Sequence, residues 1–172
     1  MVLFRLDASI REEGSFSRGL GDVVEAEWVR SHPDADIVRR HVGVDPVPAT
    51  AWPDAVAAGA VAPEARTPGQ RAAVAQAATF ADELLAADAL LFAVPLYNFG
   101  VSQHFKSWFD LTLTDPRVGP GTTSLTGKPA VLATVQGGNY RPGAPREGWD
   151  HATGWMRRVL ADVWGMDLRV VM

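Results

Sequence analysis

Short apolar runs alternate along this chain with longer stretches in which apolar side chains recur at helical spacing. Five runs have the length and composition of buried strands, at residues 2–6, 36–42, 89–94, 130–135 and 167–171. Strands that alternate with helices are typical of a parallel sheet covered on both faces. No internal repeat and no linker divides the sequence, so we expect a single three-layer α/β/α domain over residues 1–172.

Four helices are predicted between these strands. The second has the clearest start, because Thr67 suits the N-cap, Pro68 the first helical position and Gln70 the end of a capping box. The others are expected from Ser17 onward, at residues 102–113 and at residues 151–164. The segments 45–65 and 115–128 read as long surface loops. In the first helix, one apolar face is predicted to carry Leu20, Val23, Val24 and Trp28 at helical spacing.

The composition of the chain argues against several classes of protein function. The chain has 16 basic and 20 acidic residues, for a net charge of −4, and the basic residues are scattered. This pattern argues against a surface that binds nucleic acid or anionic membranes. Cysteine is absent, which excludes disulfides, thiolate metal sites and cysteine nucleophiles, so any redox chemistry requires a bound cofactor.

The two ends of the chain carry further expectations. Residues 1–6 form a short run that is apolar except for Arg5 and leads at once into Asp7, which indicates a first strand and not a signal peptide. No apolar stretch approaches the roughly 20 residues needed to span a bilayer, so we expect a cytoplasmic protein. A doubly wound sheet normally continues after its fifth strand into a helix beside the first one, but here only Met172 follows. We expect that this helix is missing from the chain or that a partner chain covers the gap.

Three serines, Ser9, Ser15 and Ser17, follow the first strand where a helix begins. Hydroxyls and unpaired backbone N–H groups at a helix N-terminus, together with the positive end of the helix dipole, form an anion site that can hold a phosphate. A simple helix cap explains this segment about equally well. Arg11 and Arg18 are available to assist a phosphate, although exposed arginines near a helix start are commonly just solvated.

Two further segments are predicted to face these serines. In a sheet of strand order 2-1-3-4-5, ligands bind at the carboxyl ends of the strands, between the first and the third. The third strand ends there in Pro-Leu-Tyr-Asn-Phe-Gly at residues 95–100, and the fourth in Gln-Gly-Gly-Asn-Tyr at residues 136–140. Each segment alone has an ordinary structural explanation, but paired glycines let the backbone come close to a flat ligand. Together the three segments predict one cleft.

These segments resemble, in order and spacing, those of the FMN-dependent NADH-azoreductases, a branch of the flavodoxin-like NAD(P)H:quinone oxidoreductases. The resemblance covers almost the whole chain, and Pro95-x-Tyr97-Asn98-Phe99 is its most specific element. It includes the serine loop, the helix with Lys106-x-Trp108-x-Asp110, and the Gly137-Gly138-x-Tyr140 loop. The sequence departs from the family at Ser102, where proline is usual, at Arg5, where the strand is normally apolar, and in ending after its fifth strand.

The resemblance implies FMN as the cofactor, held by the three segments. Ser9, Ser15, Phe16 and Ser17 would hold the phosphate; Pro95, Leu96, Tyr97, Asn98 and Phe99 would line the isoalloxazine; Thr134, Gln136, Gly137, Gly138 and Tyr140 would close over its rings. It implies two-electron transfer from NADH or NADPH to quinones or azo compounds in ping-pong order, with no catalytic side chain. Tyr140 and His104 are expected as substrate contacts.

The sequence is also compatible with two other activities, whereas two further kinds of site find no support in it. An FMN reductase that releases its flavin and a non-catalytic flavodoxin-like electron carrier remain alternatives. The glycines at residues 121–127 resemble a P-loop, but their spacing is one residue too long and Pro129 replaces the Ser or Thr that binds magnesium. The four histidines are far apart, so no metal site is expected.

A homodimer is expected, because the helix with Phe105, Trp108, Phe109 and Leu113 carries more large apolar residues than one sheet-facing side requires.

Overall fold

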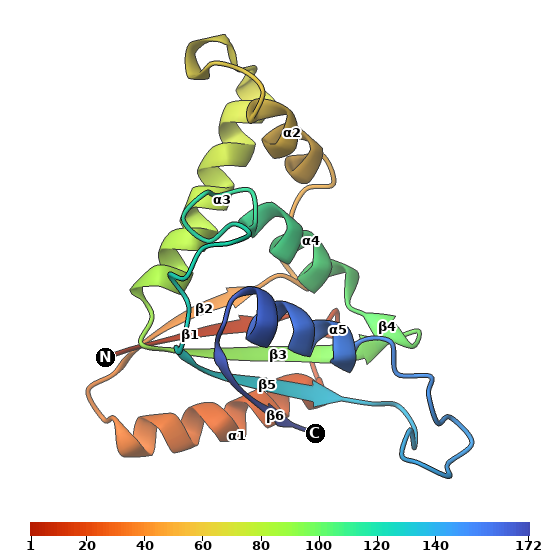
Figure 1. The fold of residues 1–172 in the computed structure, drawn as a ribbon. Coiled ribbons are helices and arrows are strands. Elements are labelled where there is room, and N and C mark those ends of the chain that lie inside the picture. Colours follow the sequence, from red (N-terminus) through yellow and green to blue (C-terminus); the bar gives the residue numbers. More distant parts are fainter.

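A twisted parallel sheet with helices on both faces forms the centre of the computed structural model, which describes residues 1–172 (Figure 1). Its strands, in spatial order, are β2 (Asp36–His41), β1 (Val2–Asp7), β3 (Ala89–Tyr97), β5 (Pro129–Val135) and β6 (Asp167–Val171). This confirms the expected α/β fold and the order 2-1-3-4-5. An additional strand of two residues, β4 (Gly100–Val101), pairs antiparallel with the end of β3 and was not expected.

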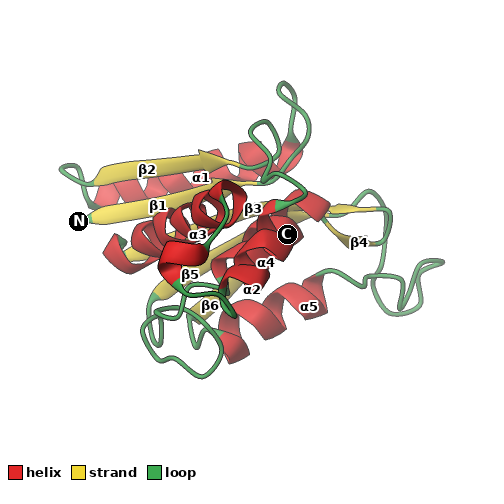
Figure 2. Ribbon diagram, turned by 90° about the horizontal axis from the view of Figure 1, so that it is seen from above, coloured by secondary structure: helices red, strands yellow, loops and turns green.

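The two faces of the sheet are covered unequally by helices (Figures 1 and 2). The helix α1 (Phe16–Ser31) lies alone. The opposite side carries α2 (Ala51–Ala58), α3 (Pro68–Ala86), α4 (Gln103–Thr112), α5 (Thr153–Arg157) and the π-helical turn η2 (Arg158–Val163). None of the helices is long and apolar enough to cross a membrane. The predicted capping box of α3 is confirmed, since Thr67 and Gln70 each accept a backbone N–H from the other.

The segment 45–65 is not the surface loop that the sequence indicated. It contains α2 and the 3-10 helix η1 (Pro63–Ala65). Alanine is the best helix former, and Pro53 falls within the first turn of α2, where a missing N–H costs nothing. The small side chains of Ala51, Ala55 and Ala58 are buried, which lets α2 pack closely beside α3.

The fourth predicted helix is also different, because it begins later and changes its pitch. Asp150 precedes α5, and its carboxylate accepts the N–H groups of Ala152 and Thr153 at 2.9 and 2.8 Å, so the helix starts after His151. Beyond Arg157 the chain widens into η2, where the N–H of Trp164 reaches back five residues to Val159. The indole of Trp164 is anchored to the Val118 carbonyl, which holds the end of this turn in place.

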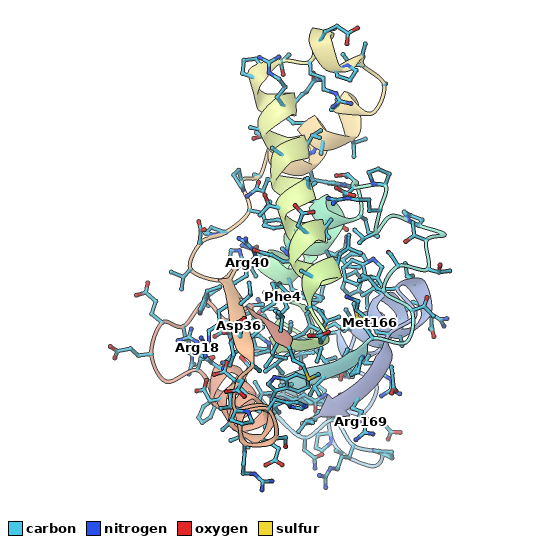
Figure 3. The ribbon with its side chains drawn as sticks, turned by 90° about the vertical axis from the view of Figure 1, so that its left-hand side faces the viewer. Phe4, Arg18, Asp36, Arg40, Met166 and Arg169 are labelled. Carbon is cyan, nitrogen blue, oxygen red and sulfur yellow. The ribbon has the colours of Figure 1, made fainter.

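The two faces of the sheet have cores of very different size. The face under α3, α4 and α5 has a cluster of 30 buried apolar residues, including Phe4 in the interior below α3 (Figure 3). The α1 face has four: Leu3, Ala89, Leu91 and Ala133. A groove of about 400 Å³ lies open on this second face, with Trp28 and Val131 on its walls and Arg169 on the outer strand (Figure 3). The expectation that a helix is missing here, or that a partner chain covers this face, stays a prediction.

Two predictions about apolar helix faces are wrong. Val23 of α1 does not pack on the sheet, because its side chain is 67% exposed and only Leu20, Val24 and Trp28 reach the small core. On α4, Phe105, Trp108 and Phe109 do not form an exposed stripe. They are buried within the monomer because aromatic side chains from β1, β3, α5 and Trp164 surround them. Association of two copies stays a prediction, without this argument for it.

Candidate functional site

The three segments singled out by the sequence meet in one cleft at the carboxyl ends of β1, β3 and β5. The cleft encloses about 560 Å³, within the range of small-molecule sites. The cleft lies between β1 and β3, where the strand order reverses because β2 lies on one side of β1 and β3 on the other. Open α/β sheets bind ligands at this position. Its walls are Ser9, Arg11, Ser15, Phe16, Ser17, Pro95, Leu96, Tyr97, Val135, Gln136 and Gly137.

The serines form a polar wall at the start of α1. Ser15 is the N-cap and its Oγ accepts the N–H of Arg18 at 3.3 Å, so the simple capping role is real. Its Oγ also lies 3.3 Å from that of Ser17, whose side chain is buried. Ser15 therefore both caps the helix and forms a hydroxyl pair with Ser17. The first N–H groups of α1, which have no partner within the helix, lie at the same helix end. Phe16 lies beside them with its ring 77% exposed.

Tyr97 ties the serine loop to the end of β3. Its hydroxyl lies 3.2 Å from Ser9 Oγ and accepts the Ile10 N–H at 3.1 Å. A purely apolar core role for this ring is therefore excluded, because the phenol oxygen fixes a loop that starts from another strand. Pro95 and Leu96 add apolar surface on the same side of the cleft.

Asn98 and Phe99 form the two-residue turn that joins β3 to β4. Their φ angles are +46° and +67°, as a type I′ hairpin requires at both central positions. Asparagine tolerates this left-handed conformation, whereas phenylalanine is strained in it. The turn is fastened from outside, because the Phe99 carbonyl accepts the His151 N–H at 2.9 Å and its ring meets Trp149 edge to face. Neither residue lines the cleft itself.

The segment after β5 forms the third wall and is supported by Asp150. The amide of Gln136 donates to the Asp150 carboxylate at 2.6 Å, which fixes the direction of this side chain. Burial alone would raise the pKa of Asp150, but N–H groups of Thr153, Ala152 and Gln136 outweigh it and lower the pKa. Asp150 was not among the predicted site residues, although an aspartate just ahead of a helix is a recognisable cap signal.

The glycine pair divides between two neighbouring cavities. Gly137 borders the main cleft, and a side chain added there would meet nothing within 4 Å. Gly138 and Tyr140 instead line an adjoining cavity of about 610 Å³, together with Gln136 and Arg141. The guanidinium of Arg146 lies over the Tyr140 ring at 5.9 Å and donates to the Gly137 carbonyl.

Besides Asn98 and Phe99, two further predicted residues lie outside both cavities. Thr134 is fully buried, and its hydroxyl has no hydrogen-bond partner. His104 is half-buried on α4 and borders neither space. Arg11, whose role the sequence left open, does line the main cleft. No group of three or more acidic or histidine side chains is placed to hold a metal ion.

The lining of the main cleft fits a ligand with an anionic end and a flat apolar body. It contains three serine hydroxyls and one arginine but no carboxylate. Ser15 and Ser17 lie at the N-terminus of α1, where the helix dipole favours negative charge. Pro95, Leu96 and Val135 supply apolar walls, and the open space at Gly137 leaves room for a ring system.

Comparisons with known proteins agree with this arrangement. A family model described as a flavodoxin-like fold matches residues 1–171. A protein of Parafrankia sp. (strain EAN1pec), named FMN-dependent NADH:quinone oxidoreductase, is 36% identical over 161 residues, covering 92% of this chain and 76% of the relative. The chain belongs to the flavodoxin-like NADH:quinone oxidoreductase family. The resemblance inferred from the sequence is thereby confirmed.

Two further matches extend the comparison. An FMN-dependent NADH:quinone oxidoreductase of Xanthobacter autotrophicus (strain ATCC BAA-1158 / Py2) is 39% identical over 179 residues, covering 98% of this chain and 84% of the relative. The crystal structure of an azoreductase from Bacillus anthracis str. Sterne superposes with a TM-score of 0.78 at 20% identity, covering 99% of this chain and 84% of the other. The second likeness supports the fold alone.

Proposed function

We propose that this oxidoreductase binds FMN non-covalently in the main cleft and transfers two electrons from NADH to quinones. The observation that carries the proposal is the meeting of a serine-lined helix N-terminus, apolar walls and an open glycine in one cleft of a chain from this family. Azo compounds as acceptors, use of NADPH and a ping-pong order belong to the same proposal.

In this proposal the residues of the chain bind the cofactor, orient it and shield it from water, while FMN, when bound, supplies the two-electron chemistry. Ser9, Ser15 and Ser17 donate hydroxyl hydrogen bonds to the phosphate, and the first turn of α1 adds backbone N–H groups. Leu96 and Val135 keep water from the flat faces of the ring. Gln136, whose amide is fixed in direction by Asp150, would be available to hydrogen-bond the flavin. The nicotinamide and the acceptor enter the same space in turn, which is why one cleft suffices.

The test begins with a visible spectrum of the purified protein. We expect flavin absorbance that copurifies and is released on denaturation as FMN. Anaerobic addition of NADH should bleach it, NADPH is titrated separately, and a quinone should restore the colour over repeated turnovers. Flavin that leaves the protein once reduced would favour an FMN reductase, and absence of bleaching by either nucleotide would favour an electron carrier.

The binding site is tested by Ser17→Asp, which would place a carboxylate against the phosphate. We expect this variant to fold but to copurify without flavin. The matched control is Ser31→Asp, a serine at the exposed far end of α1. Full flavin content in Ser17→Asp would show that the phosphate lies elsewhere. Homodimer formation and a cytoplasmic location stay predictions.

A further inference from the structure

The loop that forms the phosphate side of the cleft has almost no backbone support of its own. No backbone–backbone hydrogen bond involves residues 9–14. Two of its N–H groups are satisfied by side chains, that of Ile10 by Tyr97 and that of Arg11 by Ser9. A loop without a hydrogen-bond ladder keeps one shape only if other groups impose it.

The guanidinium of Arg18, a residue labelled in Figure 3, supplies support to the main chain of this loop. It donates to the carbonyl oxygens of Glu12 at 2.5 Å and of Arg11 at 2.6 Å. These are charge-assisted hydrogen bonds, which are stronger than those between neutral groups. Because Arg18 follows Ser17 on α1, it connects the centre of the loop to the helix that carries the other two serines.

Arg18 is itself held in place by an ionic cluster centred on the buried pair Arg5 and Asp7. Its carbonyl accepts from Arg5 at 3.1 Å, and Arg5 is fixed by a two-pronged contact with Asp7 and by Asp22 and Glu25. The Arg18 guanidinium also contacts Nε2 of His41 at the end of β2. Its Nε is buried without a partner, so the side chain gives up solvation to remain in this position.

We propose that Arg18 is a positioning residue, which fixes the main chain of residues 9–14 in the shape that presents Ser9 and Ser15 to the anion. The proposal rests on the assignment of this loop to the FMN phosphate. Arg18 does not line the cleft, so it acts through the loop and makes no contact with the ligand. Arg5, unusual inside a strand, gains a role as the residue that anchors Arg18.

The first test compares FMN with riboflavin, which lacks the phosphate. Arg18→Met should weaken FMN binding about 10- to 100-fold, the effect expected from losing hydrogen bonds made by a charged group. Riboflavin binding should change less than about twofold, and Arg18→Lys, which keeps a charged donor, should recover part of the loss. Arg30→Met is the matched control, because Arg30 lies on the last turn of the same helix and pairs only with exposed Glu27. It should match the wild type.

The second test reads the loop directly and needs no flavin. Trypsin cleaves after Arg11, whose carbonyl Arg18 holds, and cleavage of a folded loop tracks how often it opens. We expect trypsin to produce the fragment of residues 1–11 faster from flavin-free Arg18→Met than from flavin-free Arg30→Met. If Arg18→Met does not fold, Arg18→Lys takes its place in this comparison. Mass spectrometry of the N-terminal fragment gives the rate.

The outcomes separate the two proposals. Unchanged FMN affinity and unchanged cleavage in Arg18→Met, with flavin lost in Ser17→Asp, would overturn the role of Arg18 and leave the phosphate site standing. Equal losses of FMN and riboflavin affinity would also overturn it, because they would indicate general damage. Faster cleavage together with full flavin in Ser17→Asp would show that Arg18 fixes the loop but that the phosphate binds elsewhere.

Discussion

At the scale of single residues, the turn at Asn98 and Phe99 concentrates backbone strain beside the cleft. Phe99 has φ +67°, a conformation that glycine adopts freely and residues with a Cβ do not. We predict that the free energy of unfolding of Phe99→Gly is about 1 kcal/mol larger than that of Phe99→Ala. Both variants lose the ring, but only glycine relieves the backbone strain. Urea unfolding of the two variants measures the difference. Equal stabilities would contradict the left-handed backbone at this position.

His41 predicts a pH dependence of stability. Burial and the nearby Arg18 and Arg5 guanidiniums lower the pKa of His41 in the folded protein, and Asp7 opposes them only in part. The unfolded value is about 6.5. Below it the unfolded chain takes up a proton that the folded protein refuses, so stability falls with pH until the lower folded pKa is reached. Above it this group contributes no pH dependence.

The measurement compares wild type with His41→Gln by urea unfolding between pH 8 and pH 5. We expect the wild type to lose more stability than the variant as the pH drops below about 6.5. The two curves should run parallel at higher pH. Parallel curves over the whole range would show that His41 protonates equally in both states.

At the scale of elements, the turn after β2 presses against the loop after β1. A Cβ on Gly43 would lie 2.0 Å from the carbonyl oxygen of Ser9. Because this oxygen belongs to the backbone, the clash cannot be relieved by rotation of a side chain. We predict that Gly43→Ala costs about 1–3 kcal/mol through overpacking and weakens flavin binding, because Ser9 must move. The contrast is Gly19→Ala within α1, where an added Cβ meets nothing within 4 Å.

Gly19→Ala should raise stability by about 0.5–1 kcal/mol through the higher helix propensity of alanine. Thermal unfolding and FMN titration of both variants provide the comparison. A stable Gly43→Ala with normal flavin affinity would refute the close approach of the two loops.

At the scale of the whole molecule, the unequal cores predict unequal sensitivity to mutation. Leu90 and Leu91 are neighbours on β3, each 1% exposed, and they point to opposite faces. Leu90→Ala leaves an enclosed cavity in the large core and should cost about 3–5 kcal/mol. Leu91→Ala opens onto the groove beside α1, where no closed cavity remains, and should cost about 2–3 kcal/mol. Equal losses in urea unfolding would indicate that the groove is closed as tightly as the core.

The sequence by itself determined the features that depend on neighbouring residues. The five main strands, the capping box at Thr67 and the helix start at Ser15 follow from local periodicity and short-range hydrogen bonding. The strand order followed from the fold type that this alternation predicts. The meeting of three segments in one cleft was also predictable, because parallel strands bring their carboxyl ends to the same edge.

Only the tertiary structure decided features that depend on residues far apart in the chain. The apolar pattern of α4 shows which side chains avoid water but not how many faces are covered, and Trp155 and Trp164 from distant segments bury the remainder. The support of Gln136 by Asp150 likewise exists only after β5 and α5 have packed. Such contacts leave no short-range signal, since each becomes favourable only when folding has already brought its partners together.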